Sequence, residues 1–416
     1  MTELRPPLAP STYFCAREVM DPEARERDLF ARLPGLIAHA MQAPGWKRQL
    51  EGLDPRAVTD RSALGRLPIL RKARLMQLQA DHPPLGGLAC APASSFKRLF
   101  LSPGPVAEPE GDGPDWWGAA RGLYAAGIRP GDVAINCFSY HLTPGARFVE
   151  SGMHTVGAAV IPGGIGNTDQ QIEAIVRYRA TGYLGTADFL KVLLDRAAEL
   201  EKSTRTLSKA FVSGAALPSS LRSCFTAQGV SVLQGYALAD LGLIAYETVP
   251  EDGLVINEDR IVEIVHPVTG EPVEDGEVGE IVVTSFNNDY PMIRLATGDL
   301  SAIKLGQSVC GRTNRRLGGW LGRVDQSAKV KGQFVHPTQV AEIARRFCEI
   351  TAIRLIVFRM NEQDALRLEA ECATVTAPLE LAISRALKDI TKLSGDVVLV
   401  PPGTLTPDGR SIIDTR

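Results

Sequence analysis

The sequence lacks a strong charge imbalance and a long apolar run, and its first residues lack the pattern of a signal peptide. Its 416 residues include 45 basic and 48 acidic side chains, so the formal net charge is −3. This balance argues against a broad basic surface for nucleic acids. No apolar run approaches the roughly 20 residues that a membrane-spanning helix needs. The first ten residues lack the charged-then-apolar order of a signal peptide, so we expect a cytoplasmic location with no membrane partner.

The cysteines show no spacing that is typical of a metal site. Seven of them are scattered along the chain, and no two stand in a C-x-x-C pattern. Closed zinc sites usually draw their ligands from closely spaced cysteines and histidines. The sequence therefore predicts reduced, mostly buried thiols and no zinc centre.

The first two thirds of the chain alternate between helical and strand-like patterns. Residues 1–85 are predominantly helical in pattern, with apolar side chains at helical spacing within 25–42. From about residue 115, short apolar strands at 132–136, 158–162 and 182–184 are separated by helical segments of 10–15 residues. This alternation predicts an α/β fold with right-handed βαβ units and mixed, mainly parallel sheets.

The remainder of the chain has a different organisation. Hairpin-like runs at 260–265 and 280–284 predict a small β-subdomain. Residues 322–326 read as a boundary, and the 90 residues beyond them mix helical and strand patterns. We therefore expect an N-terminal domain of residues 1–321 and a mobile C-terminal α+β domain of residues 322–416, with a hinge near 322–326.

Several motifs occur in a characteristic order. Residues 290–300 read Y-P-M-I-R-L-A-T-G-D-L and follow the strand-like run 279–284. Q-G-Y-A-L-A-D stands at 234–240, G-x-x-G-E at 276–280 and G-R-V-D at 322–325. This order resembles the adenylate-forming enzymes (acyl-CoA synthetases and their relatives). The resemblance covers nearly the whole chain.

Further segments narrow the resemblance to the phenylacetate–CoA ligase branch. They are A-G-I-R-P-G-D at 126–132, F-S-Y at 138–140, V-I-P at 160–162, G-N-T-D-Q-Q at 166–171 and the tail P-G-T-L-T-P-D-G at 402–409. In that family a carboxylic acid attacks the α-phosphate of ATP to give an acyl-adenylate and pyrophosphate. The small domain then rotates, and the thiol of CoA attacks the adenylate. The resemblance implies ATP/AMP, CoA and Mg²⁺ as cofactors and a small, aromatic carboxylic acid as substrate.

The resemblance also implies where the nucleoside binds. Tyr236 matches the aromatic residue that stacks on adenine, and Asp299 matches the acid that accepts hydrogen bonds from the ribose hydroxyls. Arg323 is a second ribose or phosphate contact. Gly214 and Ala215 lie in S-G-A-A-L-P, which matches the loop beside adenine.

Other matched positions carry altered residues. Asp240 stands where the family has a magnesium-binding glutamate and is one methylene shorter. Arg410 occupies the place of the family's reactive lysine and keeps its charge in a broader, planar group. Both are candidate catalytic residues. Tyr140 and His141 fall in the stretch that walls the acyl pocket of relatives, and Asp325 falls at the hinge.

The phosphate loop departs furthest from the family pattern. Residues 102–109 read S-P-G-P-V-A-E-P where the family has S-S-G-T-T-G-K-P. Pro103 and Pro105 cannot donate backbone N–H groups to an anion. Glu108 stands in place of the lysine, where a like charge about 4 Å from pyrophosphate would cost about 4 kcal/mol at an effective dielectric near 20.

Three functional hypotheses follow from these departures. The first is an ATP-dependent acid–thiol ligase that resembles the aryl-CoA ligases. The second is an acyltransferase that has lost adenylation and moves an acyl group from CoA to an acyl carrier protein or an amine. The third is a non-catalytic protein that binds a small aromatic molecule. None of them involves a nucleic acid or a membrane.

Overall fold

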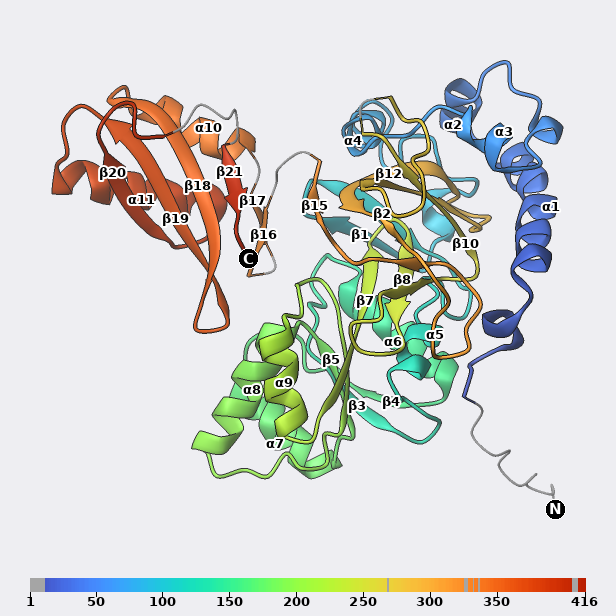
Figure 1. The fold of residues 1–416 in the computed structure, drawn as a ribbon, viewed down its shortest axis with the longest axis horizontal. Helices are drawn as coiled ribbons and strands as arrows, with labels where there is room; N and C mark the ends of the chain where they lie inside the picture. The colour runs from blue at the N-terminus through green and yellow to red at the C-terminus, as the bar shows by residue number, and fades with distance from the viewer. Residues whose placement is uncertain (1–11, 268, 325–327, 332, 336, 406–410) are drawn as a thin grey trace. The chain divides into compact units, whose positions relative to one another are not determined.

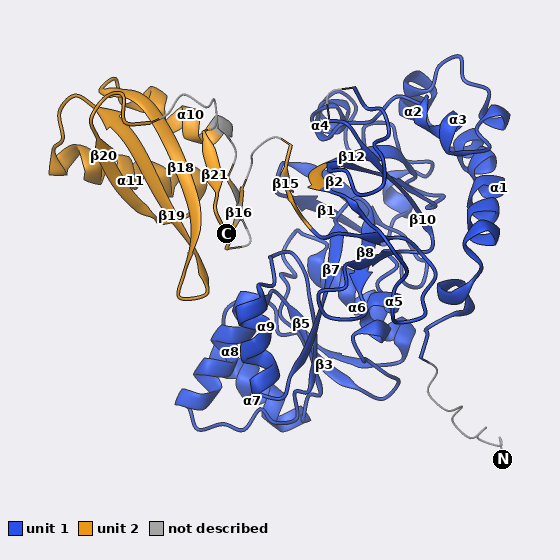
Figure 2. Cartoon of the chain, in the orientation of Figure 1, with its two compact units in different colours: residues 1–297, 301–319 blue, residues 298–300, 320–416 orange. Residues whose placement is uncertain are grey.

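The computed structural model describes residues 12–267, 269–324, 328–331, 333–335, 337–405 and 411–416 (Figure 1). The chain divides into two compact units, coloured separately in Figure 2. Unit 1 comprises residues 1–297 and 301–319, and unit 2 comprises residues 298–300 and 320–416. That the smaller part moves as a hinged domain of residues 322–416 stays a prediction.

Four helices open unit 1: α1 (Pro22–Ala40), α2 (Pro44–Gln49), α3 (Arg61–Gly65) and α4 (Lys72–Asp81). Asp21 caps α1 by accepting a hydrogen bond from the backbone N–H of Ala24 at 2.9 Å, and Pro22 occupies the first helical position. Leu33 and Ile37 of α1 are fully buried, as the helical spacing of the apolar residues predicts.

A nine-stranded sheet forms the centre of unit 1, in the order β13-β14-β9-β8-β7-β6-β5-β3-β4. Its strands are β3 (Val133–Asn136), β4 (Ala159–Ile161), β5 (Gly182–Gly185), β6 (Lys209–Val212), β7 (Ser231–Leu238), β8 (Gly242–Glu247), β9 (Leu254–Ile256), β13 (Ile303–Lys304) and β14 (Arg316–Leu317). The strands from β3 to β7 pair in parallel, as expected, whereas the pairs from β7 to β13 are antiparallel. The sheet is therefore mixed.

Helices cover both faces of the parallel strands. They are α5 (Ala120–Ala125), α6 (Gly145–Val156), α7 (Thr168–Tyr178), α8 (Ala187–Glu199) and α9 (Ser219–Ala227). Successive strand residues face opposite sides, so Leu184 packs with residues of α5 and α6, whereas Tyr183 packs with residues of α7, α8 and α9. Both side chains are fully buried, which explains why these strands read as continuous apolar runs.

Two smaller antiparallel sheets flank this core. One is the hairpin β1 (Arg98–Ser102) and β2 (Val106–Glu110), in which Ser102 pairs with Val106. The sequence analysis treated residues 102–109 as one loop, but the connection spans only the residues between Ser102 and Val106. The other sheet runs in the order β10-β11-β12, built from β10 (Arg260–Val265), β11 (Gly279–Ser285) and β12 (Met292–Ser301). This sheet confirms the expected β-subdomain.

Arg294 fixes the start of β12. Its guanidinium donates two hydrogen bonds to the carboxylate of Glu263 on β10, both at 3.0 Å, and further bonds to the carbonyl oxygens of Gly65 and Leu67. Arg294 is 1% exposed and has a left-handed backbone with φ of +48°. The arginine of the Y-P-M-I-R motif therefore has a structural role, because it holds the strand that continues to Asp299.

Unit 2 contains a four-stranded sheet in the order β20-β19-β18-β21, with two helices. Its elements are β15 (Gly322–Arg323), β16 (Ala328–Val330), β17 (Gln333–Val335), α10 (Pro337–Arg346), β18 (Ile350–Met360), β19 (Gln363–Cys372), α11 (Ala377–Thr391), β20 (Asp396–Val400) and β21 (Ile412–Asp414). The α+β character is as expected. The sequence analysis did not predict β19, a ten-residue strand that contains the alternating run L-R-L-E-A-E-C and forms a hairpin with β18.

Among the described helices of both units, we find none with the length and apolar character that crossing a bilayer would require.

We expect Arg294→Ala to lower the free energy of unfolding by about 3–5 kcal/mol, because it leaves the Glu263 carboxylate buried without its counter-charge. The measurement is guanidinium unfolding followed by circular dichroism. Arg56→Ala is the matched control, since Arg56 pairs with Asp54 on the exposed surface, and it should change stability by less than about 1 kcal/mol. Equal effects of the two substitutions would contradict the structural role of Arg294.

Candidate nucleotide site

The expected adenine-side residues gather at the carboxyl ends of two neighbouring parallel strands. The hydroxyl of Ser213, directly after β6, donates a hydrogen bond to the carbonyl oxygen of Gly235 on β7 at 2.8 Å. Gly214 and Tyr236 each follow this contact by one residue, and both are half-buried, as is Ala215. Ligands of open α/β sheets bind beyond the carboxyl ends of the strands. The structure thus brings Gly214, Ala215 and Tyr236 into one region, and their contact with adenine stays a prediction.

Gly235 has a packing reason to be glycine. A Cβ atom on Gly235 would lie 2.3 Å from the ring of the fully buried Phe211 on β6. Such a contact is far shorter than van der Waals distance, so a larger residue here would push β6 and β7 apart. The glycine of the Q-G-Y motif therefore keeps the two strands that carry Ser213 and Tyr236 in register.

Asp240 lies in the turn after β7 and forms an ion pair with Lys72, the first residue of α4. The Asp240 side chain is only 1% exposed, whereas that of Lys72 is 28% exposed. Lys72 Nζ contacts Asp240 Oδ2, while Oδ1 is buried with no hydrogen-bond partner among the described residues. The orphaned oxygen fits a cation, as the sequence analysis proposed for Asp240.

The sequence analysis did not identify Lys72, although the basic residues at the start of α4 could have indicated it. Helix N-termini favour acidic side chains because the helix dipole is positive there. The first turn of α4 contains no acidic residue, and its N-cap Arg71 and first residue Lys72 are both basic. An unfavourable placement of this kind suggests that the basic groups have acidic partners elsewhere. Those partners are Asp240 for Lys72 and Glu280 for Arg71.

Glu108 sits on strand β2, opposite Phe100, and not in the turn of the hairpin. Its side chain is buried, with the residue 2% exposed, and Ser102 Oγ donates a hydrogen bond to its Oε1 at 2.5 Å. Burial raises the pKa of Glu108 to about 7, against the opposing effects of the Ser102 hydrogen bond and the Lys72 charge. The fixed negative charge that the sequence suggested is therefore about half neutralised by a proton near pH 7.

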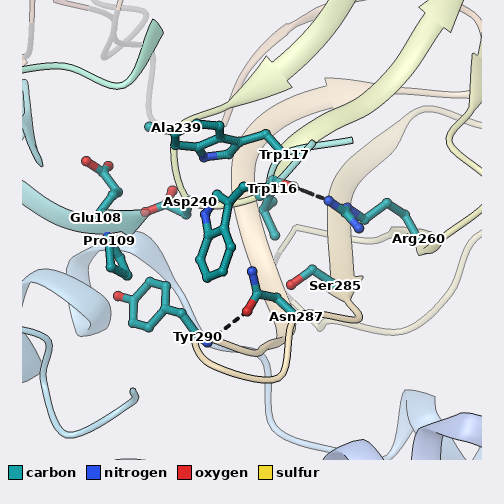
Figure 3. A pocket seen from close by; sticks show the side chains of 11 residues that line it. Glu108, Pro109, Trp116, Trp117, Ala239, Asp240, Arg260, Ser285, Asn287 and Tyr290 are labelled. Carbon is teal, nitrogen blue, oxygen red and sulfur yellow. Dashed lines mark hydrogen bonds between the residues drawn. The ribbon is translucent and has the colours of Figure 1, made fainter. Parts of the chain in front are cut away.

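Glu108 and Asp240 line the same small cavity of unit 1 (Figure 3). Its volume is about 10 Å³, the room that one water-sized occupant needs. Trp116, Trp117 and Tyr290 supply aromatic walls. The cavity thus combines two acidic groups with the guanidinium of Arg260, other polar side chains and aromatic rings, in a buried setting where electrostatic interactions are strong.

Asp299 and Arg323 contact each other within unit 2. They are register partners between β12 and β15, and Arg323 donates a hydrogen bond to Asp299 Oδ1 at 3.0 Å. Trp320, which the sequence analysis missed, donates its indole N–H to the same oxygen at 3.1 Å. Gly298 has a left-handed backbone with φ of +76°, which accounts for the glycine of T-G-D. The structure brings these two candidates together, and their contact with a ribose stays a prediction.

The two acyl-pocket candidates have different environments. Tyr140 donates its hydroxyl hydrogen to Glu150 Oε2 at 2.8 Å and accepts a hydrogen bond from Asn136 at 3.0 Å. Burial, then the hydrogen bond to Glu150, raises the pKa of Tyr140 well above its usual range. Because its hydroxyl already bonds to Glu150 and Asn136, Tyr140 would contact a bound acid through its ring. His141 is exposed.

Arg410 and Asp325 lie outside the described residues. The segment that leads toward Arg410 is described as far as Leu405, whose backbone N–H donates a hydrogen bond to Glu371 Oε1 at 2.6 Å. The charge-stabilising role of Arg410 and the hinge role of Asp325 therefore remain predictions from sequence.

Known proteins resemble this chain over nearly its full length. A family profile described as AMP-binding enzyme matches residues 117–288. The phenylacetate–coenzyme A ligase of Thermus thermophilus is 29% identical over 411 residues, which cover 89% of this chain and 91% of that protein. The phenylacetate–coenzyme A ligase of Pseudomonas putida is 28% identical over 422 residues and covers 94% of both chains.

A solved structure extends the comparison to three dimensions. The crystal structure of 2-hydroxyisobutyryl-CoA ligase in complex with 2-HIB-AMP and CoA, in the thioesterification state, matches with a TM-score of 0.84 and 25% sequence identity. The match covers 99% of this chain and 94% of that chain. The similarity of fold therefore extends well beyond the segment matched by the family profile.

The raised pKa of Glu108 predicts a pH-dependent cost to stability. The folded state holds this proton more tightly than the unfolded state, so the stabilising effect is complete below about pH 4.5 and is lost as the pH rises to about 7. Relative to the wild type, Glu108→Gln should therefore gain up to about 3 kcal/mol in unfolding free energy between pH 4.5 and 8. Urea unfolding at a series of pH values measures this gain. A difference between the two proteins that is constant with pH would contradict it.

Proposed function

We propose that this chain, a member of the adenylate-forming superfamily in its phenylacetate–CoA ligase branch, activates a small carboxylic acid with ATP and transfers the acyl group to CoA. The observation that carries the proposal is similarity to CoA ligases over 89–94% of the chain, together with a 2-hydroxyisobutyryl-CoA ligase of the same fold. The 2-hydroxyisobutyryl-CoA ligase was crystallised with 2-HIB-AMP and CoA. These correspond to the acyl-adenylate of the first proposed step and the acceptor of the second.

The proposed reaction has two steps, adenylation of the acid and then formation of the CoA thioester. A carboxylate oxygen of the acid attacks the α-phosphorus of ATP, and the bond to the bridging oxygen breaks to release pyrophosphate. The thiolate sulfur of CoA then attacks the acyl carbon, and AMP leaves with the electron pair of the acyl C–O bond. Magnesium, when bound, would neutralise negative charge on the phosphate oxygens.

We propose that the nucleoside is bound by the residues that match the family pattern. Tyr236 would stack on adenine beside Gly214 and Ala215, and Asp299 would accept hydrogen bonds from the ribose hydroxyls. Arg323 already contacts the Asp299 carboxylate at 3.0 Å, which orients it. Arg410 would stabilise negative charge on the reacting groups.

The proposal also specifies the class of acid substrate and the acyl acceptor. We propose an aromatic acid, because the relatives found by sequence over 89–94% of this chain are named for phenylacetate, with Tyr140 and His141 near its ring. We propose CoA and not a carrier protein as acceptor, because CoA is the acceptor in the names of these ligases. The prolines of the β1–β2 turn favour an ATP-independent transferase, and the experiment below separates the two.

A pyrophosphate-release assay over aromatic and aliphatic acids, with and without CoA, tests the function. We expect release that depends on the acid, is highest with an arylacetic acid and is faster with CoA, because CoA clears the adenylate. Phenylacetate and 2-hydroxyisobutyrate are the two reference acids. Acylation of a carrier protein by aryl-CoA without ATP would support the transferase instead. No turnover, with an aromatic acid still raising the melting temperature, would indicate a binding protein.

Asp299→Asn should weaken AMP binding about 10- to 100-fold, because hydrogen bonds to a charged group contribute about 1.5–3 kcal/mol. Isothermal titration calorimetry with AMP measures the change. Asp389→Asn is the control in the same unit, since Asp389 is exposed on α11, and it should bind AMP as the wild type does. Unchanged affinity in Asp299→Asn would remove Asp299 from the ribose site.

A further inference from the structure

The cavity in Figure 3 contains two carboxylates that are each only half satisfied. Glu108 Oε1 accepts the hydrogen bond of Ser102, and Asp240 Oδ2 contacts Lys72. The second oxygen of each group, Glu108 Oε2 and Asp240 Oδ1, is buried with no partner anywhere in the described chain. A buried carboxylate oxygen without a hydrogen-bond partner is unfavourable. The arrangement is therefore complete only when a hydrogen-bond donor or a cation occupies the cavity.

The two acids reach this cavity from separate parts of the fold. Glu108 comes from β2 of the hairpin, and Asp240 comes from the turn after β7. Lys72 on α4 acts on both, because it contacts Asp240 and its charge lowers the pKa of Glu108. Arg260 also lines the cavity, so with both acids ionised the four charged groups carry no net charge. A divalent cation would add two positive charges, which would favour binding of a triphosphate.

The donor set suits a cation that takes its other ligands from phosphate. In the part of the chain that the structure describes, no three His, Cys, Asp or Glu side chains form a metal-binding group. Magnesium typically binds through one or two carboxylates plus waters and the phosphates of its nucleotide, and it needs no closed protein cage. The cavity volume of about 10 Å³ is suited to one such ion.

We propose that Glu108 and Asp240 together bind one divalent cation, and that this cation supplies at the phosphate hairpin the positive charge that a lysine supplies in the family pattern. Asp240 alone was the expected magnesium ligand, and the new element is Glu108, the residue that replaces that lysine. On this view Glu108 does not repel the leaving phosphates, because it recruits the ion that binds them. The proposal rests on the proposed function in naming a nucleotide as the source of the remaining ligands.

Manganese quenching of tryptophan fluorescence provides a direct test, because Trp116 and Trp117 line the cavity. The full chain is titrated with Mn²⁺ alone and then with Mn²⁺ plus α,β-methylene-ATP, with Mg²⁺ as a non-quenching competitor. We expect saturable quenching that Mg²⁺ reverses and that tightens when the nucleotide is present. Glu108→Gln and Asp240→Asn should each weaken Mn²⁺ binding at least tenfold.

Glu110→Gln is the matched control for Glu108→Gln. Glu110 lies on the same strand and is 4% exposed, but both of its carboxylate oxygens accept hydrogen bonds from Arg98 and it does not line the cavity. It should bind Mn²⁺ with wild-type affinity. Glu108→Lys provides a second readout, because a fixed lysine should make binding of the nucleotide analogue independent of Mn²⁺.

The outcomes separate this inference from the proposed function. Wild-type Mn²⁺ affinity in Glu108→Gln would overturn the inference and mean that Glu108 Oε2 meets only water, while nucleotide binding could still support the ligase. Quenching by Mn²⁺ alone that both acid variants abolish, without any nucleotide binding to the wild type, would support the cation site and contradict the ligase. Quenching that does not saturate in the wild type would overturn the inference directly.

Discussion

The ion pair between Lys72 and Asp240 determines the electrostatics of the candidate site. It joins α4, in the N-terminal helical region, to the turn after β7, at the carboxyl ends of the parallel strands. A buried pair of this kind gives little net stability, because both charges lose hydration on folding. Its effect is to hold one oxygen of Asp240 while leaving the other without a hydrogen-bond partner among the described residues. The adjoining cavity is therefore lined by an aspartate with one oxygen that lacks a hydrogen-bond partner among the described residues.

The contacts of the hairpin β1–β2 change how its sequence is interpreted. Read as sequence, its prolines and Glu108 suggest a phosphate loop that has lost its anion-binding groups. In the fold, Glu108 is tethered by Ser102, raised in pKa by burial and within the electrostatic reach of Lys72. In sequence, Glu108 suggests the loss of a phosphate-binding lysine. In the fold, Glu108 interacts with the hydroxyl of Ser102 and the charge of Lys72, which also pairs with Asp240.

Local patterns predicted most of the architecture but few of the polar contacts. Apolar runs and helical spacing indicated the βαβ units, the β-subdomain and the α+β character of the C-terminal region, since burial on one or two faces imposes those periods. The hairpin partner β19 was missed because its alternation includes charged residues. Lys72 and Trp320 were missed because their partners lie 168 and 21 residues away, and no local period encodes such pairings. Family order indicated Asp299 and Tyr236, whereas only coordinates could show what surrounds them.

The path of strand β12 limits how this protein can be divided for experiments. Met292–Ser301 is one continuous strand, yet residues 298–300 belong to unit 2 and the rest to unit 1. A truncated chain that ends at Gly319 would retain Asp299 but lose both Trp320 and Arg323, the donors to its buried carboxylate. A fragment that starts at Trp320 would lose Asp299 itself. Neither piece is an intact module, so domain-swapped chimaeras should exchange residues 298–300 together with everything from 320 onward.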